Sequence, residues 1–553
     1  MPAAIALIVA DSRYWRFGQP AQLDDRLGEA TVFEHTLRRA ARVSRVEQIV
    51  LVHPADQPPP ALPPNLPAGK PIVTFAAPSH LYSPLDQRWV AARKWALTAW
   101  RGGLGGATVY DELLPAAVLA AAVEAHNAQA ALLLRADWCL FDPAYADALI
   151  ALHLEHPEAY KITFTQAPPG LSGIVTSLAV LKQFAQHQAG FGQALGYNPR
   201  APHPDPIGRD VNHPIPALVR DTNRRFIYDT PRSRALLTAL AQQLGPRLDE
   251  ADALTLAQAC RDLEAHDPAW HLQWLPQQVT LELTPRRPVD GPITPQHYVT
   301  FDRPDMDTDL ALRIIEQLGQ AELGGDIALL LGGLGDALLH PDWERIILSA
   351  REAGVMGLGV ETDLLCSRDA IDRLLELPLD VLSIRLNADT ADTYRQVMGP
   401  DAFGQLAEHL QYLVSRQRQK EDGLPWIVPR LIKTSQTLKD MESFFDRWVM
   451  AVGHAVIEPS RAGCGLMPQL SPVPMAPPRR RPCRQLAQRM TILSDGQVAL
   501  CDQDWLAQAP LGDAHTQPLI DIWRRVRQPL ESHLAGRFDE PALCAACSEW
   551  HRP

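Results

Sequence analysis

The sequence predicts an α/β protein built from several domains. With 553 residues, the chain is too long for a single hydrophobic core. Short apolar strands alternate with amphipathic helices through most of it, which is typical of parallel sheets, and four cysteines follow one ordered pattern near the end. We therefore expect an α/β domain with an open parallel sheet over 1–235, a helical connector over 236–277, a partial (β/α)6 barrel over 278–465 and a small metal-binding domain over 466–553.

Composition narrows the class of partner. The formal net charge of -12 disfavours a nucleic-acid binder, because neutralising phosphates requires a basic surface. The apolar stretch Ala3 to Ala10 is eight residues long, too short for a signal peptide or a membrane span. We expect a cytoplasmic protein whose partner is an unidentified protein or small molecule, with no nucleic acid and no membrane.

The first domain shows the strand–helix rhythm of a parallel sheet. Strand Ile5 to Ala10 is followed by helix Thr31 to Val43 and strand Ile49 to Val52. A later strand, Ala131 to Leu134, runs directly into Arg135-Ala136-Asp137. Ligands of such sheets bind at the carboxyl ends of strands, so Asp137 is a candidate contact for a metal–phosphate group, with an exposed loop carboxylate as the alternative.

Three segments of this domain resemble the sugar and cytidylyl nucleotidyltransferases: Leu27 to Thr36, Ala136 to Pro143, and Tyr228 to Pro231. The resemblance implies that Asp137 and Asp229 hold Mg²⁺ and a nucleotide. The opening loop Asp11 to Pro20, however, has one glycine and no lysine. Since a phosphate cradle needs close backbone approach, we expect Mg²⁺–nucleotide to bind weakly or not at all.

The second domain alternates strands and helices and predicts a partial barrel with its chemistry at the strand carboxyl ends. Glu282-Leu283-Thr284, Gly332 to Pro341 and Ile384 to Ala388 resemble motifs of the radical S-adenosylmethionine (SAM) core. The resemblance implies a SAM-binding cluster in the loop after the first strand.

The departures from that family concern this loop and its surroundings. Where the family places C-x3-C-x2-C, the chain has Arg287, Gly291 and Thr294, none of which ligates iron as a thiolate does. Arg287 also brings a positive charge that would repel iron. The acidic residue that meets the SAM amine in the family corresponds to Asp336, and a serine of the family corresponds to Arg385. We therefore expect that SAM is not cleaved and that the protein is a pseudoenzyme of that family.

The tail carries the pattern C-x17-C-x42-C-x2-C, formed by Cys483, Cys501, Cys544 and Cys547. A C-x2-C pair places two thiolates on one turn, and two further cysteines complete the four sulfurs that Zn²⁺ or an iron–sulfur cluster requires. Disulfides fit poorly because cysteines are sparse elsewhere in the chain. From spacing alone, zinc and iron–sulfur both remain open.

The residues between these cysteines resemble the SPASM or twitch extension of radical SAM enzymes. Met490 to Leu500 predicts a hairpin around Asp495-Gly496, a helix follows at Leu519 to Trp523, and Trp550 follows the last cysteine. The resemblance implies that Cys483, Cys501, Cys544 and Cys547 hold one [4Fe-4S] cluster, with structural zinc as the alternative. Cys464, between two glycines, is exposed enough to be reactive, but we expect neither a reactive role nor a ligand role for it.

Taken together, these resemblances predict an iron–sulfur protein that does not cleave SAM and that serves as a scaffold or partner in glycan or cell-surface modification. The alternatives are a nucleotidyltransferase using Asp137 and Asp229, or a redox enzyme using the single cluster.

Overall fold

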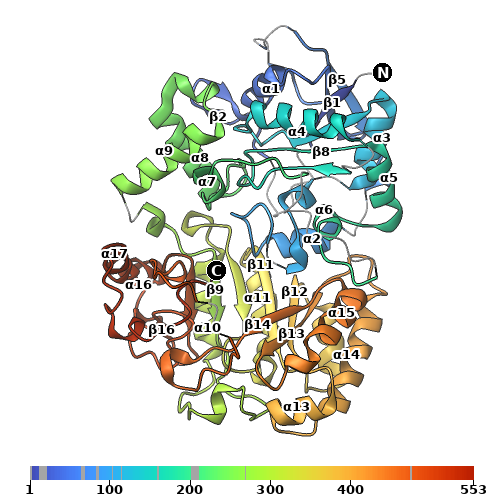
Figure 1. Ribbon diagram of the computed structural model, residues 1–553. Coiled ribbons are helices and arrows are strands. Elements are labelled where there is room, and N and C mark those ends of the chain that lie inside the picture. The colour runs from blue at the N-terminus through green and yellow to red at the C-terminus, as the bar shows by residue number, and fades with distance from the viewer. Residues whose placement is uncertain are drawn as a thin grey trace. The chain divides into compact units, whose positions relative to one another are not determined.

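A computed structural model of the chain describes residues 3–11, 21–63, 66, 69–82, 86–102, 104–113, 115–157, 161–200, 211–267, 270–473 and 476–552. The chain divides into two compact units, Met1–His266 and Asp267–Pro553 (Figure 1). Most of the opening loop discussed above, from Ser12 to Pro20, lies outside the described residues. No helix in the described part of the chain is long and apolar enough to cross a membrane.

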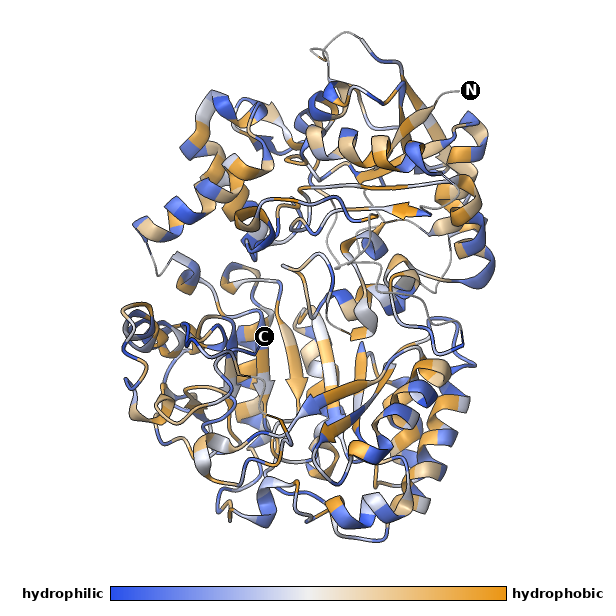
Figure 2. Cartoon of the chain, viewed as in Figure 1, coloured by the Kyte–Doolittle hydropathy of each residue, from blue (hydrophilic) through white to orange (hydrophobic). Residues whose placement is uncertain are grey.

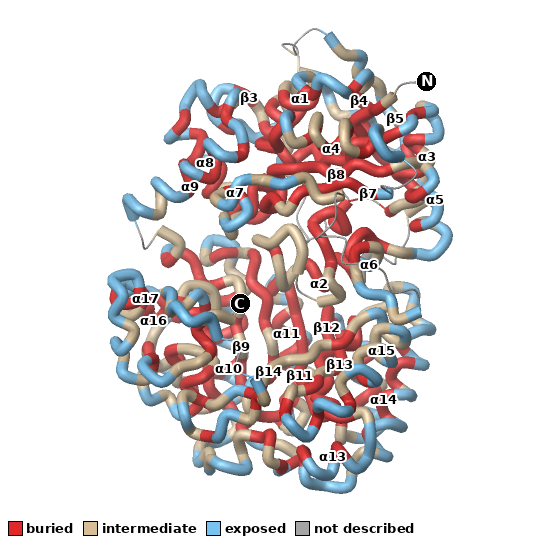
Figure 3. The backbone as a smooth tube through the Cα atoms, in the orientation of Figure 1, coloured by how far each residue is buried: buried red, intermediate tan, exposed pale blue. Residues whose placement is uncertain are grey.

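The first unit is built on a six-stranded sheet in the order β5-β4-β1-β6-β8-β7. Its strands are β1 (Ala4–Val9), β4 (Gln48–Pro54), β5 (Ile72–Ala77), β6 (Ala130–Arg135), β7 (Ile162–Thr163) and β8 (Ile174–Thr176). The four strands from β5 to β6 run parallel, as predicted, whereas β8 pairs antiparallel with both neighbours, so the sheet is mixed at one edge. β1 and β6 are buried along their whole length, as is typical of central strands in a parallel sheet, and Figure 3 shows much of the interior of this unit as buried.

The helices of this unit begin where the sequence provides caps. Thr31 accepts a hydrogen bond from the Glu34 amide at the start of α1, and Asp142 accepts one from Ala144 at the start of α4. The helices are α1 (Val32–Arg42), α2 (Asp86–Arg93), α3 (Ala116–His126), α4 (Pro143–Glu155), α5 (Leu178–His187), α6 (Phe191–Ala194), α7 (Ala217–Arg220), α8 (Pro231–Leu244) and α9 (Ala253–His266). The short strands β2 (Arg26–Leu27) and β3 (Ala30–Thr31) form a separate hairpin. Helix α9, inside the segment expected to be a connector, belongs to the first unit.

The second unit contains a nine-stranded sheet in the order β14-β13-β12-β11-β10-β9-β15-β16-β17. The six strands from β9 to β14 follow one another in space as in sequence, and all are parallel. Figure 2 shows them as largely apolar arrows. The strands are β9 (Gln278–Leu281), β10 (Ala328–Leu331), β11 (Gly357–Thr362), β12 (Val381–Arg385), β13 (Trp426–Lys433), β14 (Val456–Pro459), β15 (Arg489–Ile492), β16 (Gln497–Ala499) and β17 (Gly512–Asp513).

The tail is continuous with this sheet. β15 pairs parallel with β9 and antiparallel with β16, which forms the predicted hairpin around Asp495-Gly496. One hydrophobic core accordingly extends from the parallel strands into the tail, from Leu272 to Cys544. The helices are α10 (Thr308–Gly319), α11 (Trp343–Glu352), α12 (Arg368–Glu376), α13 (Ala391–Met398), α14 (Phe403–Gln417), α15 (Met441–Val452), α16 (Leu519–Trp523) and α17 (Arg527–Leu534).

Candidate metal centre

Local structure in the tail places each predicted cysteine. Cys501 follows the hairpin, whose turn requires glycine: Gly496 has φ 80°, and a Cβ there would lie 2.6 Å from the His515 ring. Cys544 and Cys547 share one tight turn, in which the Cys547 amide donates to the Cys544 carbonyl at 3.2 Å. The Arg480 guanidinium donates to the same carbonyl at 2.5 Å and so fixes this turn.

The structure brings all four predicted cysteines to one cavity, together with a fifth, Cys464. The expectation that Cys464 has no part in this site needs correction, because Cys464 lines the cavity. It is partly buried and its thiol is hydrogen-bonded to Cys547. Its backbone is left-handed, with φ 53°, between Gly463 and Gly465, which also have positive φ. The remaining residues that line the cavity are Arg480, Gln485, Leu486, Gln503, His533, Leu543, Glu549 and Trp550.

The thiols of this cavity differ in acidity. The hydrogen bond from Cys464 lowers the pKa of Cys547 to about 7, and the Glu549 amide, 3.3 Å from Cys547 Sγ, acts in the same direction. Burial raises the pKa of Cys544 to about 12 and also raises the pKa of Cys483. Because metals bind thiolates, loading this site must release protons.

The donor set fits an iron–sulfur cluster. Five cysteines border one shared cavity, and a [4Fe-4S] cluster is held by four thiolates. Four thiolates also hold structural zinc, with sulfurs about 2.3 Å from the ion, so the lining residues fit both groups.

Comparison with protein families identifies this segment. Residues 483–548 match the SPASM family model, described as an iron-sulfur cluster-binding domain. The tail is a SPASM domain. The sequence prediction of a SPASM tail that binds an iron–sulfur cluster is thereby confirmed, while Cys464 lies outside the matched residues.

Other similarities are weaker. An uncharacterized protein of Treponema pallidum (strain Nichols) is 32% identical over 129 residues, which are 23% of this chain and 35% of that protein. This chain thus matches about a third of the relative's length. BtrN in complex with AdoMet and 2-DOIA covers 49% of this chain and 92% of its own, at 13% identity and TM-score 0.35.

Two further solved structures are similar at the same level. SuiB of Streptococcus suis bound to S-adenosylmethionine covers 57% of this chain and 84% of its own, with 12% identity and TM-score 0.40. A cytidylyltransferase from Leptospira borgpetersenii covers 48% and 96%, with 14% identity and TM-score 0.30. At these scores neither fold nor activity carries over from these proteins.

The loop after β9 is held by contacts of its own. Arg287 forms an ion pair with Asp363, which directly follows β11, with Nε 2.9 Å from Oδ2. Gly291 lies against α13, where a Cβ would be 2.2 Å from the Val397 carbonyl oxygen. The buried Thr294 hydroxyl donates to the Gly291 carbonyl at 2.7 Å. The expected repulsion of iron by Arg287 therefore needs correction, because Asp363 neutralises that charge.

Polar side chains at the carboxyl ends of the neighbouring strands β10 and β12 also make internal hydrogen bonds. Asp336 accepts hydrogen bonds from the Thr362 hydroxyl and the Asp363 amide, at 3.0 and 2.8 Å. Burial and the neighbouring Asp363 raise the pKa of Asp336 to about 6. Arg385, on β12, pairs with Glu361 at 2.8 Å and donates to two backbone carbonyls of the loop after β10, those of Gly333 and Gly335.

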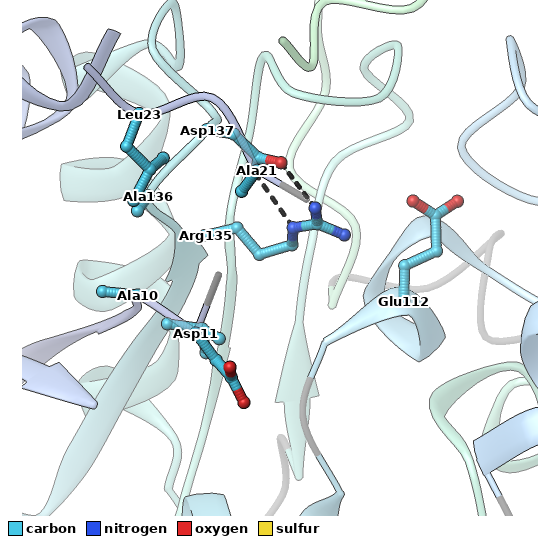
Figure 4. Close-up of a pocket in the computed structure, with 9 residues that line it drawn as sticks. Ala10, Asp11, Ala21, Leu23, Glu112, Arg135, Ala136 and Asp137 are labelled. Carbon is cyan, nitrogen blue, oxygen red and sulfur yellow. Dashed lines mark hydrogen bonds and ion pairs between the residues drawn. The ribbon is translucent and has the colours of Figure 1, made fainter. Parts of the chain in front are cut away.

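In the first unit, Asp137 lies at the carboxyl end of β6 as predicted, where it lines a pocket with Asp11 and Glu112 (Figure 4). Its carboxylate is paired with Arg135, with Nε 2.9 Å from Oδ1. Burial raises the pKa of Asp137, and the charge of Asp229 adds to this. The two predicted aspartates are thus close enough to interact.

Asp229 also has an arginine partner. Arg225 contacts both of its carboxylate oxygens, with Nη2 2.5 Å from Oδ2, and also pairs with Glu112 at 2.6 Å. Each candidate Mg²⁺ ligand therefore already faces a fixed cation. The sequence motifs did not indicate these pairings.

Proposed function

We propose that this chain is an iron–sulfur protein that carries one [4Fe-4S] cluster on Cys483, Cys501, Cys544 and Cys547 and does not cleave SAM. The observation that carries the proposal is the Arg287–Asp363 ion pair, which lies in the loop where the resembled family keeps its SAM-binding cluster. A SAM-cleaving cluster needs three thiolates and one iron with an open position. This loop provides none of the three.

The proposal that SAM is not cleaved is supported by the contacts that residues of this loop already make, rather than by repulsion between Arg287 and iron. A cysteine at position 291 would collide with the backbone of α13, and Thr294 is committed to the Gly291 carbonyl. The Arg385 guanidinium donates hydrogen bonds to the carbonyls of Gly333 and Gly335. These residues directly precede Asp336, which corresponds to the residue that meets the SAM amine in the resembled family. These internal hydrogen bonds support the proposal that the loop holds no SAM-binding cluster.

The tail then carries the redox chemistry of the chain. A bound [4Fe-4S] cluster supplies one-electron transfer. The cysteines hold it, Arg480 fixes the C-x2-C turn, and the Glu549 amide donates to Cys547 Sγ. A cluster with four thiolate ligands has no iron with an open position for a substrate. We therefore favour a structural or electron-transfer role, with a protein partner, over substrate activation. Glycan or cell-surface modification remains our proposed setting.

Nucleotide transfer in the first unit is the rival function. It has less support, because Asp137 and Asp229 each face an arginine that would compete with Mg²⁺. Calorimetric titration with Mg²⁺ and CTP should give weak binding or none. Micromolar binding that is lost in both Asp137→Ala and Asp229→Ala would favour the rival.

Iron and sulfide analysis of anaerobically prepared protein tests the main proposal. We expect a brown protein with on the order of four irons and four sulfides per chain. A colourless protein with one zinc would contradict the cluster, and on the order of eight irons would contradict the single site.

A further inference from the structure

His533 lies against the cysteine cavity at the last turn of α17 and is buried, at 1% exposure. Its ring meets the Phe538 ring edge-on, with centroids 5.5 Å apart, and the Arg480 guanidinium lies over the same Phe538 ring, 5.2 Å from its centroid. The backbone amide of Cys483 donates to His533 Nδ1 at 3.3 Å. The imidazole is therefore held by packing and by a hydrogen bond from a predicted cluster ligand.

That hydrogen bond determines the tautomer. A backbone N–H is always a donor, so Nδ1 must accept and carries no proton. The proton of the neutral ring is then on Nε2. Nε2 is buried and has no hydrogen-bond partner among the residues that the structure describes. Buried N–H groups are almost always paired, so an unpaired one beside a cavity lined by five cysteines points to an acceptor that occupies that cavity.

We propose that His533 is a hydrogen-bond donor to the iron–sulfur cluster, with Nε2–H donating to a sulfide or a cysteinyl sulfur. Such a bond draws electron density from the sulfur and stabilises the reduced cluster, which carries more negative charge. His533 therefore raises the reduction potential of the cluster. It is a positioning residue and not a ligand, since Nε2 is protonated and the cavity already offers enough thiols.

The hydrogen bond between the Cys483 amide and His533 Nδ1 also connects two parts of the tail. Cys483 precedes β15, whereas His533 lies on α17, and the Nδ1 hydrogen bond joins these two parts of the tail. The ring thus ties the backbone of one cluster ligand to the helix that presents Nε2. This inference rests on the proposed cluster, but it concerns the potential of that cluster rather than its existence.

The test is an EPR-monitored redox titration of the full-length, cluster-loaded protein. His533→Phe keeps an aromatic ring and removes both nitrogens, while His533→Gln keeps a side-chain N–H of similar reach. We expect both variants to keep the wild-type iron count, with a clearly lower midpoint potential for Phe and a potential near wild type for Gln. His515→Gln is the matched control, because His515 is exposed in the same domain and does not line the cavity.

The other outcomes would overturn the inference, call for a second measurement, or refute the proposed function. Equal potentials in wild type and His533→Phe would show that Nε2 makes no bond to the cluster. Iron loss in both His533 variants would make the residue a ligand or a purely structural element. If Phe alone fails to load, ¹⁵N coupling from His533 in the reduced wild-type cluster decides, and its absence overturns the proposal. A wild-type protein without a cluster would instead refute the proposed function.

Discussion

Arg287 and Asp363 form an ion pair between the loop after β9 and the end of β11, and their side chains are 5% and 0% exposed. Burial of both charges is costly unless their geometry is good, and here the guanidinium contacts both carboxylate oxygens. The pair joins the loop after β9 to the end of β11, and it is the observation on which our proposal that SAM is not cleaved depends.

Removing one member of this pair should be costly. We expect Asp363→Asn to lower the free energy of unfolding by roughly 3–5 kcal/mol, because it leaves Arg287 buried and unpaired. The adjacent pair Arg286–Asp305 is the control, with side chains 56% and 31% exposed. Asp305→Asn should cost at most about 1 kcal/mol. Urea unfolding measures both, and equal losses would mean that the buried pair has no special role.

Restoring the three cysteines should not restore a cluster. We expect Arg287→Cys/Gly291→Cys/Thr294→Cys to be less stable than the wild type and to bind no additional iron, because a side chain at 291 meets the backbone of α13. The double variant Arg287→Cys/Thr294→Cys, which keeps Gly291, separates the collision from the lost ion pair. A second cluster in the triple variant would show that the loop can still hold a cluster and that only the three cysteines are missing.

The five cysteines of the tail should separate into ligands and a neighbour. Alanine at Cys483, Cys501, Cys544 or Cys547 should abolish most of the bound iron and destabilise the tail, since metal binding is coupled to folding. Cys464→Ala should retain on the order of four irons. Iron analysis of the purified variants measures this. If Cys464→Ala contained no iron and Cys483→Ala kept its iron, Cys464 and not Cys483 would be the ligand.

Acid should weaken the first unit through Glu112. Burial opposes ionisation, but Arg225 and Arg93 outweigh it and lower the pKa of Glu112 to about 2. Because the folded pKa is depressed, this stabilisation is fully present above the unfolded pKa of about 4.3 and is lost as pH falls toward 2. The hydrogen-exchange protection factors of the β6 amides, corrected for the intrinsic exchange rate at each pH, should fall across this window in the wild type. The same fall in Glu112→Gln would contradict the assignment.

The sequence predicted what depends on local pattern. Apolar runs gave the strands β1 and β6, Asp495-Gly496 gave the hairpin, and the spacing from Cys483 to Cys547 gave the tail site. Each of these follows from residues close in sequence or from a known spacing.

The features that could not be predicted from the sequence depend on tertiary contacts. Asp363 is 76 positions from Arg287, so no local motif could show that the arginine is neutralised. Cys464 precedes the patterned cysteines and joins them only through a left-handed turn between two glycines. His533 belongs to no sequence motif, and its proposed role depends on a backbone donor and a buried nitrogen that only the structure shows.

Turnover of SAM tests the central claim most directly. Reduced, cluster-loaded protein is incubated with SAM and dithionite, and 5′-deoxyadenosine is measured against a control that contains dithionite without protein. We predict no product above that control, because no three-thiolate site with an open iron is available in the loop after β9. Product at a clear multiple of the control would contradict the account.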